Sequence, residues 1–459
     1  MKLTGKHIGF FGGIILCILI CLLPLQGIPQ EGKLCLAFTL MTVVWWATQV
    51  TQSGYVGGVY VMLLCLFKLA EPSVIFSAWT GSTIWLVVGA YLIASAVRTS
   101  GLGERLSYAF ILRCVRSWKS IIISIFVLTF VLSILIPHPW PRAFLIMSVM
   151  TVVIKAARIP KKDAVTIGFS VFAASVPVSI IFLTGDATIN PLAASYADEP
   201  VSFVRWLQVM GPPAAVLSIL TLLLILILFR PSAPVNMDLD QVRQAQKELG
   251  PMGTREKRTL IWMIIAIVLW LTNGITGLDI GWITLTIAML MSLPVVGEVL
   301  SPKDWSEVPV HVMVFLTAAM AIGKVGAATG MNAWIADTLL PESLPENILL
   351  TGLFIVLIAA VIHMFMGSVI AVMGVAVPAL LTFANSMGIP SLVIIGLVYL
   401  AVAGHYLLPF HHLNMLVGQG EENGMYTQKE TIKMGIPLFL AILVTAAFAL
   451  GWWTIIGLL

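Results

Sequence analysis

Two charged side chains of this sequence, Arg142 and Asp186, lie inside long apolar runs. Burying a charge is costly unless it is paired or hydrogen-bonded, so such residues usually serve a purpose. The guanidinium of Arg142 could bind an anionic oxygen pair as a bidentate fork, and we favour this role. It could instead form a structural ion pair with Asp186. Asp186 could also carry a proton or cap a helix end.

Five histidines concentrate in the same regions of the chain. No carboxylate or histidine box with metal-ligand spacing accompanies them, so the pattern does not predict a metal-dependent enzyme. Polar lining of a cavity, or a proton relay, fits isolated imidazoles better. We expect no cofactor and no metal centre, and a bound sodium ion is kept only as a weaker alternative. The histidines are His138, His363, His405, His411 and His412.

The composition requires that lipid surrounds the elements that position these groups. The chain has 459 residues, of which 59% are hydrophobic and 10% charged, whereas soluble domains carry roughly 25% charged residues. Its mean hydropathy is +1.02. The five cysteines form no CxxC pair and no disulfide framework. We predict an all-α polytopic membrane protein that spans a lipid bilayer, and we expect neither a soluble enzyme nor a nucleic-acid partner.

Apolar runs of spanning length recur along the chain. The first run is predicted to be a retained helix and not a signal peptide, because no small-residue cleavage site follows it. Two longer stretches are interrupted near their middles and are predicted to be re-entrant hairpins, whose tips can line a water-filled cavity. The hairpins cover 120–154 and 348–387. The eleven predicted spans are 8–25, 33–51, 54–71, 82–98, 165–195, 203–229, 259–273, 280–296, 308–330, 391–418 and 434–456.

Basic residues indicate the orientation of these spans. With the N-terminus in the cytoplasm, the predicted cytoplasmic loops hold 20 of the 25 lysines and arginines. Cytoplasmic loops of membrane proteins carry such an excess. We therefore predict a multi-pass protein of the plasma (bacterial inner) membrane with a cytoplasmic N-terminus.

The two halves of the chain resemble each other. His138 and His363 are offset by 225 residues, and Asn190 and Asn414 by 224. An odd number of spans per repeat inverts the second copy, and inverted repeats with broken helices are typical of transporters. The predicted domains are a first helix (1–32), repeat 1 (33–229), a cytoplasmic linker (230–258) and repeat 2 (259–459).

Polar residues at the predicted hairpin tips and helix breaks complete a candidate binding site. Half-helix N-termini at such breaks point positive dipoles at an anion, although each side chain could equally serve as a backbone cap. The predicted substrate-binding residues are His138, Pro139, Trp140, Arg142, Thr184, Asp186, Thr188, Asn190, Gly367, Ser368, His411, His412 and Asn414.

Several motifs resemble those of the divalent-anion/sodium symporter family, which belongs to the wider ion-transporter superfamily. They are Trp45-Trp46-Ala47-Thr48-Gln49, Gly101-Leu102-Gly103-Glu104-Arg105-Leu106, the stretch 304–330, and Pro409-Phe410-His411-His412-Leu413-Asn414. The resemblance covers nearly the whole chain. It implies a homodimeric elevator-type carrier of dicarboxylates, tricarboxylates or sulfate.

The hairpin tips depart from the pattern of that family. Typical members carry Ser-Asn-Thr at each tip, which contacts the substrate and frames a sodium site. Here the first tip reads His138-Pro139-Trp140, and the second keeps only Ser368. We therefore expect a secondary transporter of a small divalent anion that works by sodium-independent exchange or proton coupling. The alternatives are a cation/proton antiporter that uses Asp186 and, with less support, an intramembrane enzyme.

Overall fold

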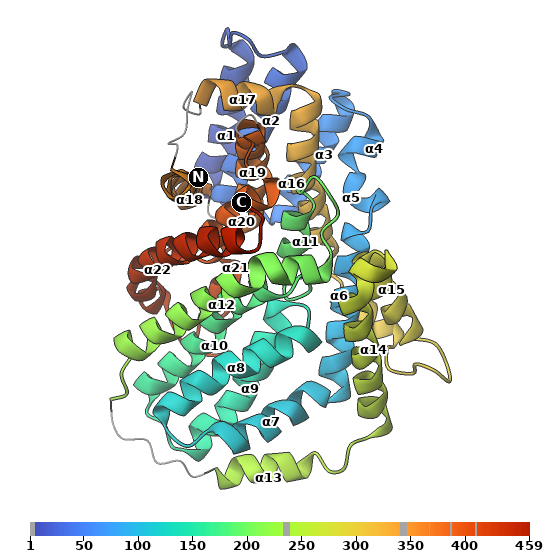
Figure 1. Ribbon diagram of the computed structural model, residues 1–459, viewed down its shortest axis with the longest axis vertical. Helices are drawn as coiled ribbons and strands as arrows, with labels where there is room; N and C mark the ends of the chain where they lie inside the picture. The colour runs from blue at the N-terminus through green and yellow to red at the C-terminus, as the bar shows by residue number, and fades with distance from the viewer. Residues whose placement is uncertain (1–4, 233–238, 340–346, 367, 386–387, 409–410) are drawn as a thin grey trace.

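The computed structural model describes residues 5–232, 239–339, 347–366, 368–385, 388–408 and 411–459. Every named element in this described part is a helix (Figure 1). Nine of the described helices are long and apolar enough to cross a membrane, and shorter apolar helices accompany them. The prediction of an all-α polytopic membrane protein is therefore confirmed.

The first helices of the chain extend from one end of the molecule, where α1 to α3 lie, to the other, where α7 lies (Figure 1). Gly101 has a φ of 85° and ends α6 in the left-handed conformation that glycine adopts without strain, so that α7 can leave in a new direction. The segment 102–114, expected as part of a cytoplasmic loop, is therefore a helix. The elements are α1 (Gly5–Leu22), α2 (Gln30–Ala47), α3 (Ser53–Leu66), α4 (Pro72–Ile75), α5 (Ser77–Thr80), α6 (Thr83–Ser100) and α7 (Leu102–Cys114).

Two helix pairs occupy the stretches predicted as hairpins. In the first pair, Pro139 stands at the first turn of the second helix, where its missing N–H costs nothing. The side chain of His138 caps that helix. The pairs are α8 (Trp118–Leu135) with α9 (Pro139–Ala156), and α18 (Ile348–Met366) with α19 (Val369–Asn385).

An interrupted helix and a long helix follow each pair. The predicted spans 165–195 and 391–418 are each broken in the middle, because several residues there lack helical hydrogen bonds. The interrupted helices are α10 (Lys161–Ile181) with α11 (Ile189–Ala194), and α20 (Ser391–Ala403) with α21 (Leu413–Val417). The long helices are α12 (Phe203–Leu228) and α22 (Gln428–Ile455).

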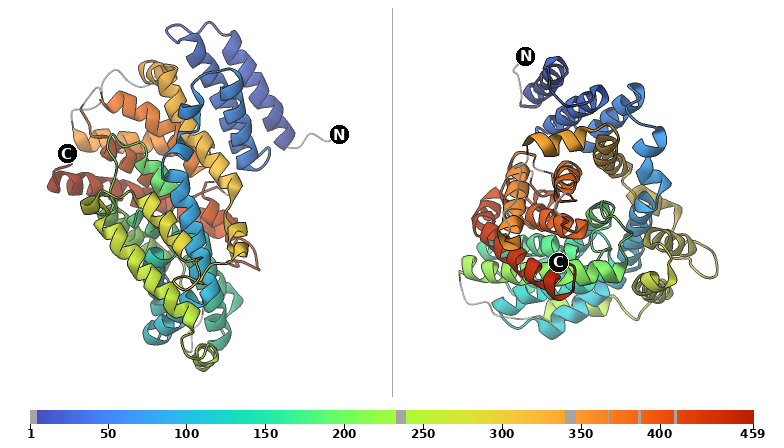
Figure 2. Two further views of the ribbon diagram at one scale, coloured as in Figure 1. Left: turned by 90° about the vertical axis from the view of Figure 1, so that its right-hand side faces the viewer. Right: turned by 45° about the horizontal axis from the view of Figure 1, so that its top comes forward.

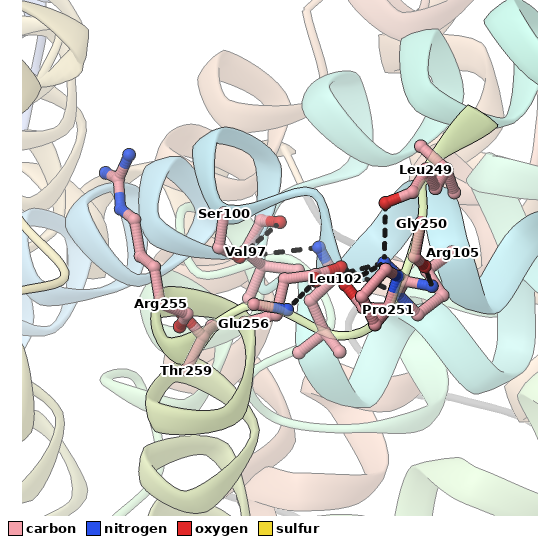
Figure 3. A network of polar contacts seen from close by, with 11 residues as sticks. Val97, Ser100, Leu102, Arg105, Leu249, Gly250, Pro251, Arg255, Glu256 and Thr259 are labelled. Carbon is pink, nitrogen blue, oxygen red and sulfur yellow. Dashed lines mark hydrogen bonds and ion pairs between the residues drawn. The ribbon is translucent and has the colours of Figure 1, made fainter.

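The segment that joins the two halves is fastened to α7. Arg105 donates to Glu256 at 2.8 Å and to the carbonyl of Gly250 at 2.9 Å (Figure 3). Glu256 also accepts the backbone N–H of Gly253 at 2.7 Å. The remaining elements are α13 (Asp240–Glu248), α14 (Thr254–Thr276), α15 (Ile280–Leu290), a 3-10 helix (Pro302–Glu307), α16 (Val310–Ala328) and α17 (Met331–Leu339).

The packing has an approximate twofold character. Helix α3 packs along α16, and α15 packs along α6 (Figure 2). Both interrupted helices pack against the helix pair of their own half. Loops that the predicted topology places on one side also touch. Lys161 forms an ion pair with Glu421 at 2.6 Å and holds the pKa of that exposed carboxyl below its usual range.

Candidate functional site

A cavity of about 580 Å³ lies where the helix pairs and the interrupted helices meet. Its polar lining comes from the first helix pair, both helix breaks, the second helix pair, the turn between α2 and α3, the start of α16, and single residues of α1 and α6. The polar lining residues are Lys6, Gln49, Thr51, Gln52, Ser53, Tyr91, His138, Trp140, Asp186, Thr188, His311, Ser368, His411, His412 and Asn414.

The connection between α8 and α9 forms one wall of the cavity. His138 Nδ1 accepts the backbone N–H of Trp140 at 3.2 Å, and His138 Nε2 lies 2.6 Å from the Tyr91 hydroxyl. The backbone also ties this connection to the break in the next helix, because Ala187 donates its N–H to the Pro137 carbonyl at 3.1 Å.

Arg142 lies behind this wall, fully buried and not among the lining residues. Its Nη1 donates to the carbonyls of Ile136 at 3.0 Å and Gly185 at 3.2 Å, and its Nη2 donates to the Ser179 hydroxyl at 2.5 Å. Ile136 and Ser179 lie at the C-terminal ends of α8 and α10, where helix dipoles leave partial negative charge, and Gly185 lies in the break that follows α10. A buried cation therefore balances two helix C-termini.

Asp186 lies next in sequence to one of these acceptors but faces the cavity. One carboxylate oxygen accepts the N–H groups of Thr188 at 3.0 Å and Ile189 at 3.1 Å, which caps the start of α11. Among the described residues, the ion pairs do not include one between Arg142 and Asp186. Both residues therefore satisfy backbone groups of the same break separately.

Asn190, in α11 on the other side of the break, connects this helix to the end of α10 by side-chain hydrogen bonds. Its amide donates to the carbonyls of Ser179 and Phe182, both at 2.8 Å, and its oxygen accepts the Tyr399 hydroxyl. Because Tyr399 belongs to α20, this contact joins the interrupted helix of one half to that of the other. The side chain is fully buried and does not line the cavity.

The second helix pair brings Ser368 to the cavity at the start of α19, where its hydroxyl accepts the N–H of Ala371 at 3.4 Å. This position mirrors that of His138 at the start of α9. The N-terminal ends of α9 and α19 thus reach the same cavity from different halves of the chain.

Three buried histidines lie together beside the second helix pair. Nitrogens of His363, His405 and His411 lie within 4.8 Å of one another. Nδ1 of His411 accepts N–H groups from Leu407 and Leu408 at 3.2 Å, and Nε2 of His363 lies 3.0 Å from the carbonyl of His411. Three histidines equal the number of protein ligands of a catalytic zinc, so the expected absence of a metal centre stays a prediction.

The structure brings most of the predicted site residues together. His138, Pro139, Trp140, Asp186, Thr188, Ser368, His411, His412 and Asn414 line the cavity, whereas Arg142, Thr184 and Asn190 lie behind its wall. Gly367 lies outside the described residues.

The sequence reasoning missed several lining residues. Tyr91 and Gln52 come from segments without a motif or a helix break, whereas Gln49 ends the double-Trp segment and His311 lies in the stretch 304–330. These two motifs were the available signals.

Comparison with known proteins identifies the family. Residues 5–459 match the family described as the sodium:sulfate symporter transmembrane region. The chain belongs to this family. Its match to the family is continuous across both halves, so the predicted resemblance is confirmed.

Relatives of this symporter family member include membrane proteins of bacteria. A membrane protein of Cupriavidus necator is 21% identical, over 99% of this chain and 94% of that one. The sodium-dependent dicarboxylate transporter SdcS of Staphylococcus saprophyticus is 23% identical, over 88% of this chain and 83% of that one.

Two solved structures share the fold of this family member. The Alcanivorax borkumensis YdaH transporter has a TM-score of 0.52 and 14% identity, over 94% of this chain and 99% of that chain. MtrF of Neisseria gonorrhoeae has a TM-score of 0.57 and 15% identity, over 97% of each chain. The protein is a membrane transporter and not an enzyme, as predicted.

Proposed function

We propose that this protein carries a small divalent oxyanion, such as a di- or tricarboxylate, sulfate or a sulfonate, and that the cavity is its binding site. One observation carries the proposal: the N-terminal ends of α9 and α19 reach the same cavity. The positive end of each helix dipole favours negative charge. At α9 the dipole acts without free N–H groups in the first turn, because Pro139 and Pro141 carry none and His138 accepts that of Trp140. The family description and the dicarboxylate transporter among its relatives support the same class of solute.

Sodium independence is supported by the position of Arg142. In broken-helix transporters, unwound carbonyls and half-helix C-termini are the groups that coordinate a coupling cation. Here the carbonyls of Ile136 and Gly185 already accept hydrogen bonds from the guanidinium. A second cation there would meet a like charge, which costs about 4 kcal/mol at 4 Å and an effective dielectric constant near 20. Arg142 thus acts as a tethered cation in place of sodium and positions the binding wall without touching the substrate.

Proton coupling is supported by Asp186. Among the lining residues of the described part, Asp186 is the one carboxylate and Lys6 the one lysine or arginine. An oxyanion that enters this cavity meets a like charge unless Asp186 is protonated. Binding of the anion therefore favours uptake of a proton with it, and exchange of anions remains possible without net proton movement.

The same carboxylate supports the second candidate, a cation/proton antiporter. In that case Asp186 would bind a cation in its ionised form and release it on protonation. An antiporter would move sodium or potassium against a pH gradient and would show no saturable anion uptake. The convergent helix N-termini favour the anion carrier.

The predicted orientation of the protein in the membrane determines which transport state the structure represents. With the N-terminus in the cytoplasm of an inner membrane, the cavity-lining segments 49–54 and 311–315 lie at cytoplasmic helix ends. The structure then corresponds to an inward-facing state. An elevator movement of the helix pairs and interrupted helices in a homodimer, with the two predicted repeats forming one carrier, would complete the cycle.

Counterflow into proteoliposomes tests the proposal. Proteoliposomes that contain the purified protein are preloaded with unlabelled succinate, citrate, sulfate or a sulfonate. Uptake of the same anion in labelled form is then followed with and without sodium at constant ionic strength. We expect saturable uptake of at least one anion and no requirement for sodium. The absence of uptake for every anion would reject the anion carrier.

A further inference from the structure

The hydroxyl of Tyr91, a residue on α6 that no motif singles out, lies 2.6 Å from Nε2 of His138. Both side chains are buried and both line the cavity. The rings pack with their centroids 4.5 Å apart. The two groups thus form one unit on the wall of the proposed binding site.

The backbone decides where the protons of this unit lie. The N–H of Trp140 points at Nδ1 of His138, at 3.2 Å, so Nδ1 supplies a lone pair. A neutral imidazole carries its single proton on the other nitrogen, which is Nε2. His138 therefore donates to the oxygen of Tyr91, and the hydroxyl proton of Tyr91 must point to a different acceptor.

We propose that the Tyr91 hydroxyl donates a hydrogen bond to an anionic oxygen of the substrate, and that His138 positions it for this role. The inference rests on the proposed anion transport by the same cavity. Asp186 and Thr188 line the same cavity, so their side-chain oxygens are the protein acceptors for a hydrogen bond from this hydroxyl when the cavity holds no anion. A polarised O–H donor selects for a solute with an acceptor at this point, because a solute without one leaves the buried donor unpaired.

This unit also explains how the site can hold an anion with little fixed positive charge. A hydroxyl that accepts from one donor becomes a better donor itself, since hydrogen bonds in a chain polarise one another. The chain runs from the Trp140 backbone through His138 to Tyr91 and ends at the cavity. It starts at the N-terminal turn of α9, so the helix dipole acts in the same direction.

Three variants separate this role from a structural one. Tyr91→Phe keeps the ring and removes the hydroxyl, which is both the donor to the substrate and the acceptor of the His138 N–H. His138→Asn keeps an acceptor that caps α9, since asparagine is a good N-cap residue, but it is too short to reach Tyr91. Tyr60→Phe is the matched control, because Tyr60 is a fully buried tyrosine whose hydroxyl bonds Thr39 at 3.0 Å and lies outside the cavity lining.

The experiment measures counterflow of succinate and sulfate, thermal stability, and the ring 15N shifts of His138 in labelled protein. We expect KM to rise about 10- to 100-fold in Tyr91→Phe and His138→Asn, at similar maximal rates and melting temperatures, and to stay unchanged in Tyr60→Phe. We also expect His138 to be neutral and protonated on Nε2.

Two results would overturn the inference. The first is an unchanged KM in Tyr91→Phe while the unaltered protein transports the anion, and the second is a His138 ring protonated on Nδ1. Failure of the proposed function appears differently, as the absence of uptake of either anion by the unaltered protein. In that case the ring shifts still decide whether His138 donates to Tyr91.

Discussion

Arg142 and Asp186 serve the same helix break without bonding to each other. Arg142 reaches the carbonyl of Gly185, while the carboxylate of the next residue turns to the N–H groups of Thr188 and Ile189. At this break, the positive side chain therefore bonds carbonyls that lack helical partners, and the negative side chain bonds N–H groups that lack helical partners. This arrangement leaves Arg142 away from the cavity and Asp186 on its lining.

Removal of the guanidinium should destabilise the protein. Arg142→Ala leaves the buried carbonyls of Ile136 and Gly185 and the Ser179 hydroxyl without this donor, at about 1–3 kcal/mol for each group. We expect a lower melting temperature and little transport. Because the structure shows no ion pair with Asp186, the double change Arg142→Ala with Asp186→Ala should not restore folding, whereas added guanidinium ion should restore part of it.

Thermal unfolding of the two single variants and the double variant in detergent measures this coupling. Full recovery of both stability and transport in the double variant would show that the two residues form a functional pair. Sodium-stimulated transport in Arg142→Ala, absent from the unaltered protein, would support the role of the guanidinium as a tethered cation.

Replacement of the cavity carboxylate should uncouple transport from protons. Asp186→Asn keeps an acceptor for the N–H groups of Thr188 and Ile189, so the start of α11 stays capped. Net uptake by the unaltered protein should rise as pH falls, because the protonated carboxyl does not repel the anion. The variant should exchange anions at a rate that depends little on pH. Counterflow and net uptake between pH 5.5 and 8 measure both, and equal pH dependence in the two proteins would contradict the coupling role.

Accessibility of single cysteines should report the orientation. In a background without the native cysteines, Lys161→Cys lies at the start of α10 and Asp198→Cys in the segment after α11. We expect a membrane-impermeant maleimide to label Asp198→Cys in intact cells and Lys161→Cys only in inverted vesicles. Labelling of both positions from one side would reject the predicted topology.

The ion pair between Arg105 and Glu256 should contribute more stability than an exposed pair. Its side chains are 19% and 10% exposed, and Arg105 also donates to the carbonyl of Gly250. Arg105→Ala should lower the free energy of unfolding by about 1.5–3 kcal/mol, as expected for hydrogen bonds to a charged group. The control Arg243→Ala, from an exposed pair with Asp240, should change it by at most about 0.5 kcal/mol. Denaturation in detergent compares them, and equal losses would show that the linker is not held by Arg105.

The sequence by itself determined the solvent of the protein, its helical class and the regions of chemical interest. Apolar runs of spanning length permit only helices in lipid, because every backbone group must be satisfied within its own segment. Pro139 and the polar residues around it mark an interruption that no continuous helix tolerates, so the first hairpin tip could be predicted. The break around Asp186 was expected from the resemblance to the family and not from a proline at that place.

Only the tertiary structure decided which polar groups face the cavity. Arg142 and Asp186 are both charged residues in apolar runs, and nothing in the sequence tells which of the two side chains faces the cavity. The direction of each side chain depends on which nearby backbone groups lack helical partners. These groups are carbonyls for Arg142 and N–H groups for Asp186. Tyr91 lies in an uninterrupted helix and carries no sequence signal of a role. Its role depends on His138, which lies 47 residues away in the chain. Contacts between distant segments depend on packing, so they cannot be predicted from local sequence patterns.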